Sequence, residues 1–126
     1  MQHRRRGPTS QSVQTLLKYA AMMDRAALRD WIDANPVADY TAAVRNLAGR
    51  IQAFISEGTG PTCTPADLQL LTELAGELVK TATSRLNDPL LAEDAREEAR
   101  LRLAAGSEIG ILRDFVSKSL ETGRNG

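Results

Sequence analysis

Residues 62–89 carry a start signal, an apolar stripe and a stop signal for one long helix, and this stretch constrains the fold more than any other. Thr64 can cap the helix because its hydroxyl accepts a bond from an unpaired amide of the first turn. Pro65 suits the first helical position, and Asp67 places negative charge at the positive end of the helix dipole. At the other end, Asn87 is expected to cap in the left-handed conformation, and Pro89 prevents continuation. Apolar residues recur between these ends at helical spacing, which predicts one continuous helix with a buried face made of Leu68, Leu71, Leu74, Ala75, Leu78, Val79, Ala82 and Leu86.

Part of this stretch, residues 71–86, resembles the helix-turn-helix of bacterial repressors. The resemblance consists of an alanine in the first helix, Ala75, and of residues 81–85, which are similar to the start of a recognition helix. A helix-turn-helix needs a sharp turn between its helices, usually at a glycine. That turn would fall at residues 78–80, which contain no helix breaker, and Gly76 comes too early. The pattern therefore favours an unbroken core helix over a DNA-reading motif.

The composition predicts an all-α protein with no β-sheet. The chain of 126 residues is long enough for one domain, only 4% of the residues are aromatic, and β-branched residues never form alternating runs. Amphipathic segments joined by short loops bury their stripes against one another, so we predict an antiparallel bundle of roughly four to six amphipathic helices. The predicted organisation is a flexible basic arm at residues 1–8, a helical-bundle domain at residues 9–122 and a frayed C-terminus at residues 123–126.

The first helical segment, residues 10–34, is predicted either as two helices or as one bent helix. Thr9, Ser10 or Ser12 can cap its start, and Asp24 can cap a second, short helix. The segment ends at Asn35-Pro36, because a residue before proline is pushed out of helical geometry. Its inner face is predicted to contain Val13, Leu16, Leu17, Ala20, Met23, Ala27, Leu28, Trp31 and Ile32.

The next helix is predicted to start after the capping residue Asp39. It ends at Gly58, and the following Gly60-Pro61 is typical of a loop. The spacing of apolar residues gives it an inner face of Tyr40, Ala43, Val44, Leu47, Ile51, Phe54 and Ile55.

The last third of the chain is predicted to begin a helix at Asp88-Pro89 and to pair Glu98 with Arg102, four residues on. Gly106 lies inside its apolar stripe. The helix either breaks at this glycine, or the glycine lets a neighbouring helix approach closely. A glycine inside a helix costs about 1 kcal/mol, so a break or kink at Gly106 is the favoured prediction. The stripe contains Leu101, Ala105, Ile109, Leu112, Val116 and Leu120.

Few residues in this chain could support catalysis or bind a metal. The one histidine, His3, lies in the N-terminal arm, and a single cysteine, Cys63, cannot supply a zinc site. Cys63 precedes a helix N-terminus, a position that lowers a thiol pKa, but the sequence offers no nearby base to activate it. Glu73 and Glu77 are interpreted as parts of a solvated face. We therefore predict no catalytic residue, no cofactor and no metal, and a protein that is not an enzyme.

The lack of a reactive cluster favours a small cytoplasmic protein that acts by protein–protein interaction, as an adaptor, inhibitor or assembly factor, or by self-association. Met22, Met23 and Trp31 are candidate partner contacts, since thioethers adapt to a partner and a tryptophan can anchor it. Trp31 has a second interpretation, as an anchor of the core. A cytoplasmic location is expected because the lone cysteine cannot form an internal disulfide. No apolar run approaches the roughly 20 residues needed to cross a membrane, so no membrane partner is expected.

The run Arg4, Arg5 and Arg6 supports an alternative function, that of an accessory nucleic-acid-binding protein or regulator. These arginines are candidate contacts to phosphates, and alone they would give weak, salt-sensitive binding. Lysine plus arginine equal aspartate plus glutamate at 16 each, so the whole chain has no positive field to attract nucleic acid. A solubilising tail is the other interpretation of the run.

Deletion of residues 1–7 tests this alternative. If the arm binds nucleic acid, its loss weakens binding to DNA or RNA and lowers the slope of log affinity against log salt by roughly 2–3, because three phosphate contacts disappear. Titration of labelled DNA and RNA at two salt concentrations measures both effects. An unchanged affinity and slope would leave the run as a solubilising tail.

Overall fold

The regular secondary structure of the described residues is entirely helical, which confirms the predicted all-α class. The computed structural model describes residues 7–23, 25–36, 39–58, 60 and 62–125. In chain order its elements are α1 (Ser10–Met22), the 3₁₀ helix η1 (Arg25–Leu28), α2 (Arg29–Ala34), α3 (Tyr40–Glu57), α4 (Pro65–Leu86) and α5 (Glu93–Asn125). α4 is one continuous helix, as predicted, and α5 continues beyond residue 122, where the predicted domain ends.

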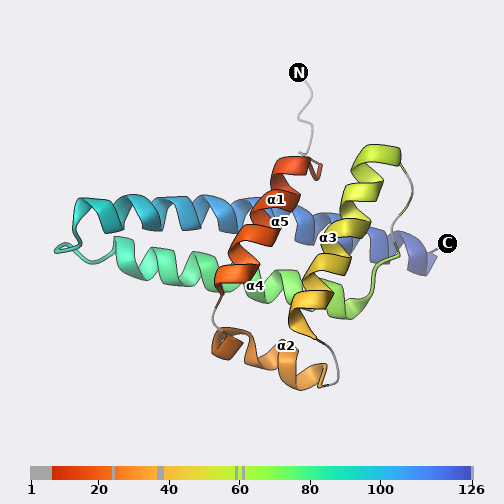
Figure 1. Ribbon diagram of the computed structural model, residues 1–126, viewed down its shortest axis with the longest axis horizontal. Helices are drawn as coiled ribbons and strands as arrows, with labels where there is room; N and C mark the ends of the chain where they lie inside the picture. Colours follow the sequence, from red (N-terminus) through yellow and green to blue (C-terminus); the bar gives the residue numbers. More distant parts are fainter. Residues whose placement is uncertain (1–6, 24, 37–38, 59, 61, 126) are drawn as a thin grey trace.

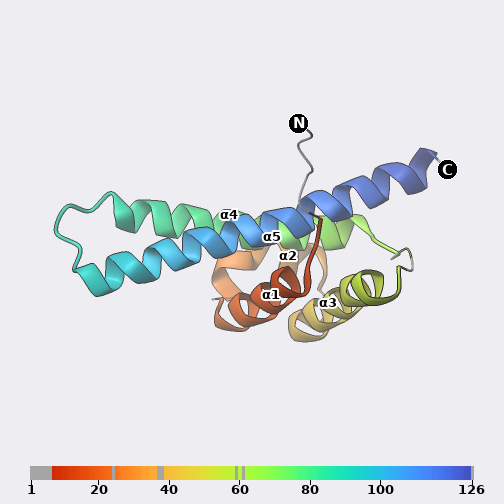
Figure 2. The same ribbon diagram turned by 90° about the horizontal axis from the view of Figure 1, so that it is seen from above.

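The helices form two layers (Figures 1 and 2). α4 and α5 make a long antiparallel hairpin, and α1 and α3 lie antiparallel to each other across one face of it. η1 and α2 lie between α1 and α3 in the chain and sit at one end of this pair (Figure 1). The outer part of the hairpin, which ends in the turn between α4 and α5, extends well beyond α1. The hairpin is therefore the surface on which the N-terminal half of the domain is built.

Side-chain caps fix where three helices begin, as the sequence predicts. At α1, the amide of Ser12 donates to Oγ1 of Thr9 at 3.2 Å. At α3, Asp39 accepts bonds from two amides of the first turn. At α4, the amide of Asp67 donates to Thr64 Oγ1 at 3.2 Å, and the amide of Thr64 donates to Asp67 Oδ2 at 2.9 Å. These bonds satisfy amides that have no partner inside their own helix.

Residues 10–34 form separate helices rather than one bent helix. α1 ends at Met22, and Met23 adopts an extended backbone with φ −74° and ψ 138°, which interrupts the helical path. Asp24, the predicted cap of the second helix, lies outside the described residues. α2 follows η1 directly, and the residue at its N-cap position, Leu28, makes no side-chain cap bond.

The turn between α4 and α5 differs from the prediction in two respects. Asn87 has φ −81° and ψ −7°, so it is right-handed and not the predicted left-handed cap. α5 begins at Glu93 and not at Asp88-Pro89, because Asp88 forms a turn of its own in which Oδ1 accepts the Leu90 amide at 2.9 Å. Arg96 of α5 donates to carbonyl oxygens at the end of α4 and in this turn. The Arg96 guanidinium thus satisfies carbonyl oxygens at the end of α4, which is the role expected of the left-handed cap.

α4 contacts α5 on one side and η1 with α2 on another, so it buries more of its circumference than the predicted stripe covers. Leu74 and Leu78 are buried as predicted. Leu70 is also buried although it lies outside the predicted stripe, whereas Val79, a member of the stripe, is 38% exposed. The buried residues that form the core are Val13, Leu16, Ala20, Leu28, Trp31, Tyr40, Val44, Leu47, Ala48, Ile51, Leu70, Leu71, Leu74, Ala75, Leu78, Ala105, Ile109, Leu112 and Val116.

The predicted break at Gly106 is wrong, and the alternative of a close helix approach is correct. α5 runs without interruption through this glycine. A Cβ atom at Gly106 would lie 2.7 Å from Cγ2 of Val79 and 3.4 Å from the carbonyl oxygen of Ala75. Glycine fits at this position because α4 occupies the space that a side chain would need.

Alanine substitutions at Gly106 and Gly110 test this contact. A Cβ at Gly110 meets only Arg113 Nη2, at 3.9 Å, so Gly110→Ala should raise the free energy of unfolding by up to about 1 kcal/mol through helix propensity. Gly106→Ala should be less stable than Gly110→Ala by about 1–3 kcal/mol, because the new methyl group collides with the rotationally restricted Val79. Urea unfolding measures both, and Val79→Ala should relieve the defect. Equal stabilities of the two alanine variants would contradict the close approach.

Candidate functional site

The three predicted partner contacts lie close together in the sequence, but the structure gives them different environments. Met22 is 53% exposed at the end of α1. Met23 is half-buried and packs against the core. Trp31 is only 3% exposed. The surface available to a partner is therefore that of Met22 with an edge of Met23.

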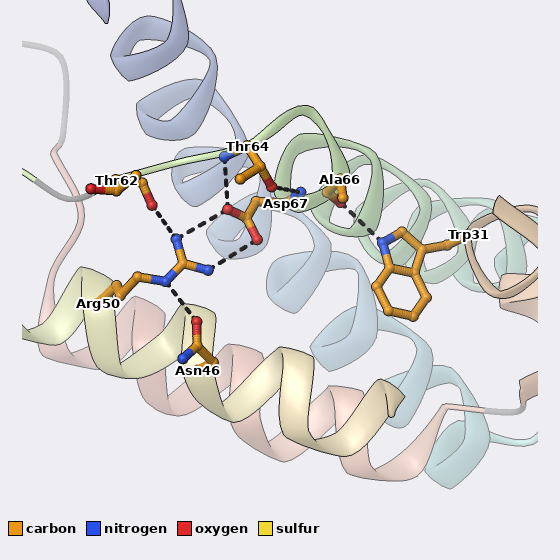
Figure 3. Close-up of polar contacts among 7 residues, drawn as sticks. All are labelled: Trp31, Asn46, Arg50, Thr62, Thr64, Ala66 and Asp67. Carbon is orange, nitrogen blue, oxygen red and sulfur yellow. Dashed lines mark hydrogen bonds and ion pairs between the residues drawn. The ribbon is translucent and has the colours of Figure 1, made fainter. Parts of the chain in front are cut away.

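Trp31 is an anchor of the core, in agreement with the second interpretation of this residue. Its indole Nε1 donates to the carbonyl oxygen of Ala66 at 3.0 Å, which joins α2 to the first turn of α4 (Figure 3). Its ring meets that of Tyr40 edge-on, with centroids 6.1 Å apart. Its backbone amide donates to Glu73 Oε1 at 3.1 Å. A buried indole with its donor satisfied is unavailable to a partner.

The sequence suggested that Glu73 belongs to a solvated face, and this prediction is wrong. It is half-buried, and besides the Trp31 amide it accepts a bond from Gln69 Nε2 at 2.9 Å. Trp31 lies in the first turn of α2, whose own capping residue offers no side-chain acceptor. The Glu73 carboxylate therefore supplies from α4 the cap that α2 lacks.

Met22 lines a groove of about 340 Å³ between the end of α1 and the hairpin. The apolar part of this Met22 groove comes from the two methionines, from η1 and from Leu78 of α4. Charged side chains of α4 and α5 complete it. The groove is lined by Met22, Met23, Ala27, Glu77, Leu78, Thr81, Arg85 and Arg102.

Three other large apolar side chains in the described part of the chain are well exposed, and none lines the Met22 groove. Leu101, at 56% exposure, lines a neighbouring groove of about 370 Å³ between α1 and α5, together with Tyr19. Leu90 lies in the turn at the end of the hairpin and is 90% exposed, and Val79 lies beside Gly106. Only the Met22 groove, among these sites, combines an exposed methionine side chain at the end of α1 with side chains of both α4 and α5.

A cluster of polar side chains around Arg50 ties α3 to the start of α4 (Figure 3). Arg50 makes a two-pronged ion pair with Asp67, with Nη1–Oδ2 at 3.0 Å and Nη2–Oδ1 at 3.1 Å. It also donates to the carbonyl oxygen of Thr62 and to Oδ1 of Asn46, the latter at 2.7 Å. Because all three nitrogens of the Arg50 guanidinium already donate to protein acceptors, the cluster is structural rather than a binding site.

Cys63 lies beside this cluster, and its thiol is less acidic than its position before a helix suggested. Burial raises the pKa of Cys63, and the nearby Asp67 carboxylate raises it further. Arg50 and a hydrogen bond with Ser119 act in the opposite direction and are outweighed. The expected lowering of the thiol pKa is therefore wrong, because desolvation and a carboxylate dominate over the helix N-terminus.

The structure gives no candidate metal site and no candidate membrane-spanning helix within the residues that it describes. His3, Arg4, Arg5 and Arg6 lie outside the described residues. Within the described ranges, no group of three or more histidine, cysteine, aspartate or glutamate side chains could hold a metal ion. Among the described helices, none combines the length and the apolarity that crossing a bilayer requires.

Comparison with known proteins finds no family model, no curated protein and no solved structure that matches the chain. Its function is therefore inferred from its own residues.

The reactivity of Cys63 provides a test of the local electrostatics. A raised pKa leaves less thiolate at neutral pH, so alkylation by iodoacetamide should be slower in the folded protein than after unfolding in urea, and its rate should rise only at higher pH. The pH–rate profile, followed by mass spectrometry, measures the shift. A native rate equal to that of the unfolded chain at every pH would contradict the assignment.

Proposed function

We propose that this protein is a non-enzymatic, cytoplasmic interaction protein that binds a helix of another protein in the Met22 groove. The observation that carries the proposal is the 53% exposure of Met22 in a groove whose lining joins the apolar side chains of Met23 and Leu78 to charged side chains of α4 and α5. Burial of that side chain by a partner would remove apolar surface from water.

The shape and chemistry of the groove favour a helix as the bound element. Its lining residues come from the end of α1 and from η1 on one side and from α4 and α5 on the other, so it is bounded by helices on both sides. Amphipathic helices bind in such grooves by inserting apolar side chains at helical spacing. Methionine adapts to such side chains because its thioether is flexible and polarizable.

Glutamate substitution of Met22 tests the proposal. Met22→Glu replaces the exposed apolar side chain of the groove with a charge, and loss of a contact that anchors a partner costs about 2 kcal/mol, or roughly 30-fold in affinity. The measurement is the yield of photo-crosslinked partner in host cells from a photoreactive residue at Arg29, which is exposed and leaves Met22 free for substitution. Thermal unfolding should change little, since more than half of the Met22 side chain is exposed.

Leu90→Glu is the matched control, because Leu90 is even more exposed but lies at the far end of the hairpin. The proposal requires crosslinked partners that disappear in Met22→Glu and persist in Leu90→Glu. Sedimentation of the purified protein separates a foreign partner from a second copy of the chain. Crosslinks that are absent, or equally present in both variants, would overturn the proposal.

A further inference from the structure

Three side chains of α4 form a row along one wall of the Met22 groove. Glu77, Thr81 and Arg85 are spaced four residues apart and all line the groove. Side chains at this spacing lie on one face of a helix. The rise of an α-helix separates Glu77 from Arg85 by about 12 Å, or two turns. The wall therefore has a negative end, a hydroxyl in the middle and a positive end.

The two charges of this row are not used within the described part of the protein. Neither the Glu77 carboxylate nor the Arg85 guanidinium makes a hydrogen bond or an ion pair with another described side chain. Arg102, the other cation of the groove, donates to Glu98 at 3.1 Å and is thereby neutralised, as the sequence predicts for this pair. The charges left for an occupant are one anion and one cation on α4.

We infer that the occupant of the Met22 groove is an amphipathic helix with a carboxylate and a cation about two turns apart on either side of an apolar residue. The carboxylate pairs with Arg85, the cation pairs with Glu77, and the apolar residue lies over Leu78 beside Met22. This inference rests on the proposed function and adds the chemistry of the partner. Its support is the row itself, in which two opposite charges lie two turns apart on the groove wall without an ion pair to another described side chain. Charges of opposite sign on the occupant would neutralise both.

The experiment selects helical peptides from a library displayed on a rigid helical scaffold, with the full-length protein as the immobilised target. Wild-type protein should enrich peptides with opposite charges seven or eight positions apart. Arg85→Glu leaves two carboxylates on the wall and should enrich peptides with two cations. Lys80→Glu is the matched control: Lys80 is an exposed cation on the same helix that does not line the groove, so its substitution should leave the selected pattern unchanged.

Binding of one enriched peptide, measured by fluorescence anisotropy, then tests the pairing directly. Arg85→Glu should weaken this peptide at least about tenfold, and exchange of the peptide's carboxylate for lysine should restore the lost affinity. Each outcome is decisive. Peptides whose binding needs Met22 but whose charges follow no pattern would overturn the inference and leave the proposed function intact. Failure to select any peptide that depends on Met22 would overturn both.

Discussion

The close contact between Gly106 and α4 sets the separation of the two long helices, and the second layer is built on the surface that they share. Without a Cβ atom at this position, α5 comes within van der Waals distance of Val79 and of the Ala75 carbonyl. Core side chains of the two helices, among them Leu74 and Leu112, then lie close enough to form one continuous apolar floor. A wider hairpin would leave voids in that floor, and voids are costly in a core that must be packed to high density.

Apolar contacts are not directional and do not by themselves fix the orientation of a helix. Polar contacts fix how α1, α2 and α3 are placed on the α4–α5 hairpin. The Arg50–Asp67 pair holds α3 against the start of α4. The indole of Trp31 holds α2 to the same turn. On α1, the buried hydroxyl of Ser12 donates to Glu108 of α5 at 2.9 Å. Each helix of the second layer thus has a polar contact with the hairpin, and partly buried polar groups of this kind favour the one arrangement that satisfies them.

The start of a helix could be predicted from the sequence wherever a residue next to it in the chain determines it. Thr64 and Asp39 cap their helices with nearby amides, so their roles needed no knowledge of the fold. The roles of Gly106 and Glu73 depend on helices that meet only after folding. For that reason the favoured break at Gly106 and the solvated position of Glu73 were wrong, although close approach at Gly106 was the stated alternative.

For the candidate site, the sequence indicated Met22 and Met23 by residue type. It could not show the groove, whose opposite wall comes from α4. In the sequence, Arg85 belongs only to residues 81–85, the part of the chain that resembles a repressor motif. In the outer part of the hairpin, α4 and α5 have no other described helix beside them (Figure 1), so local opening there is expected to cost less free energy than in the part beneath α1 and α3. The Met22 groove lies where these two regions meet. A helix bound in it would contact both regions and would raise the free energy of local opening in the outer one.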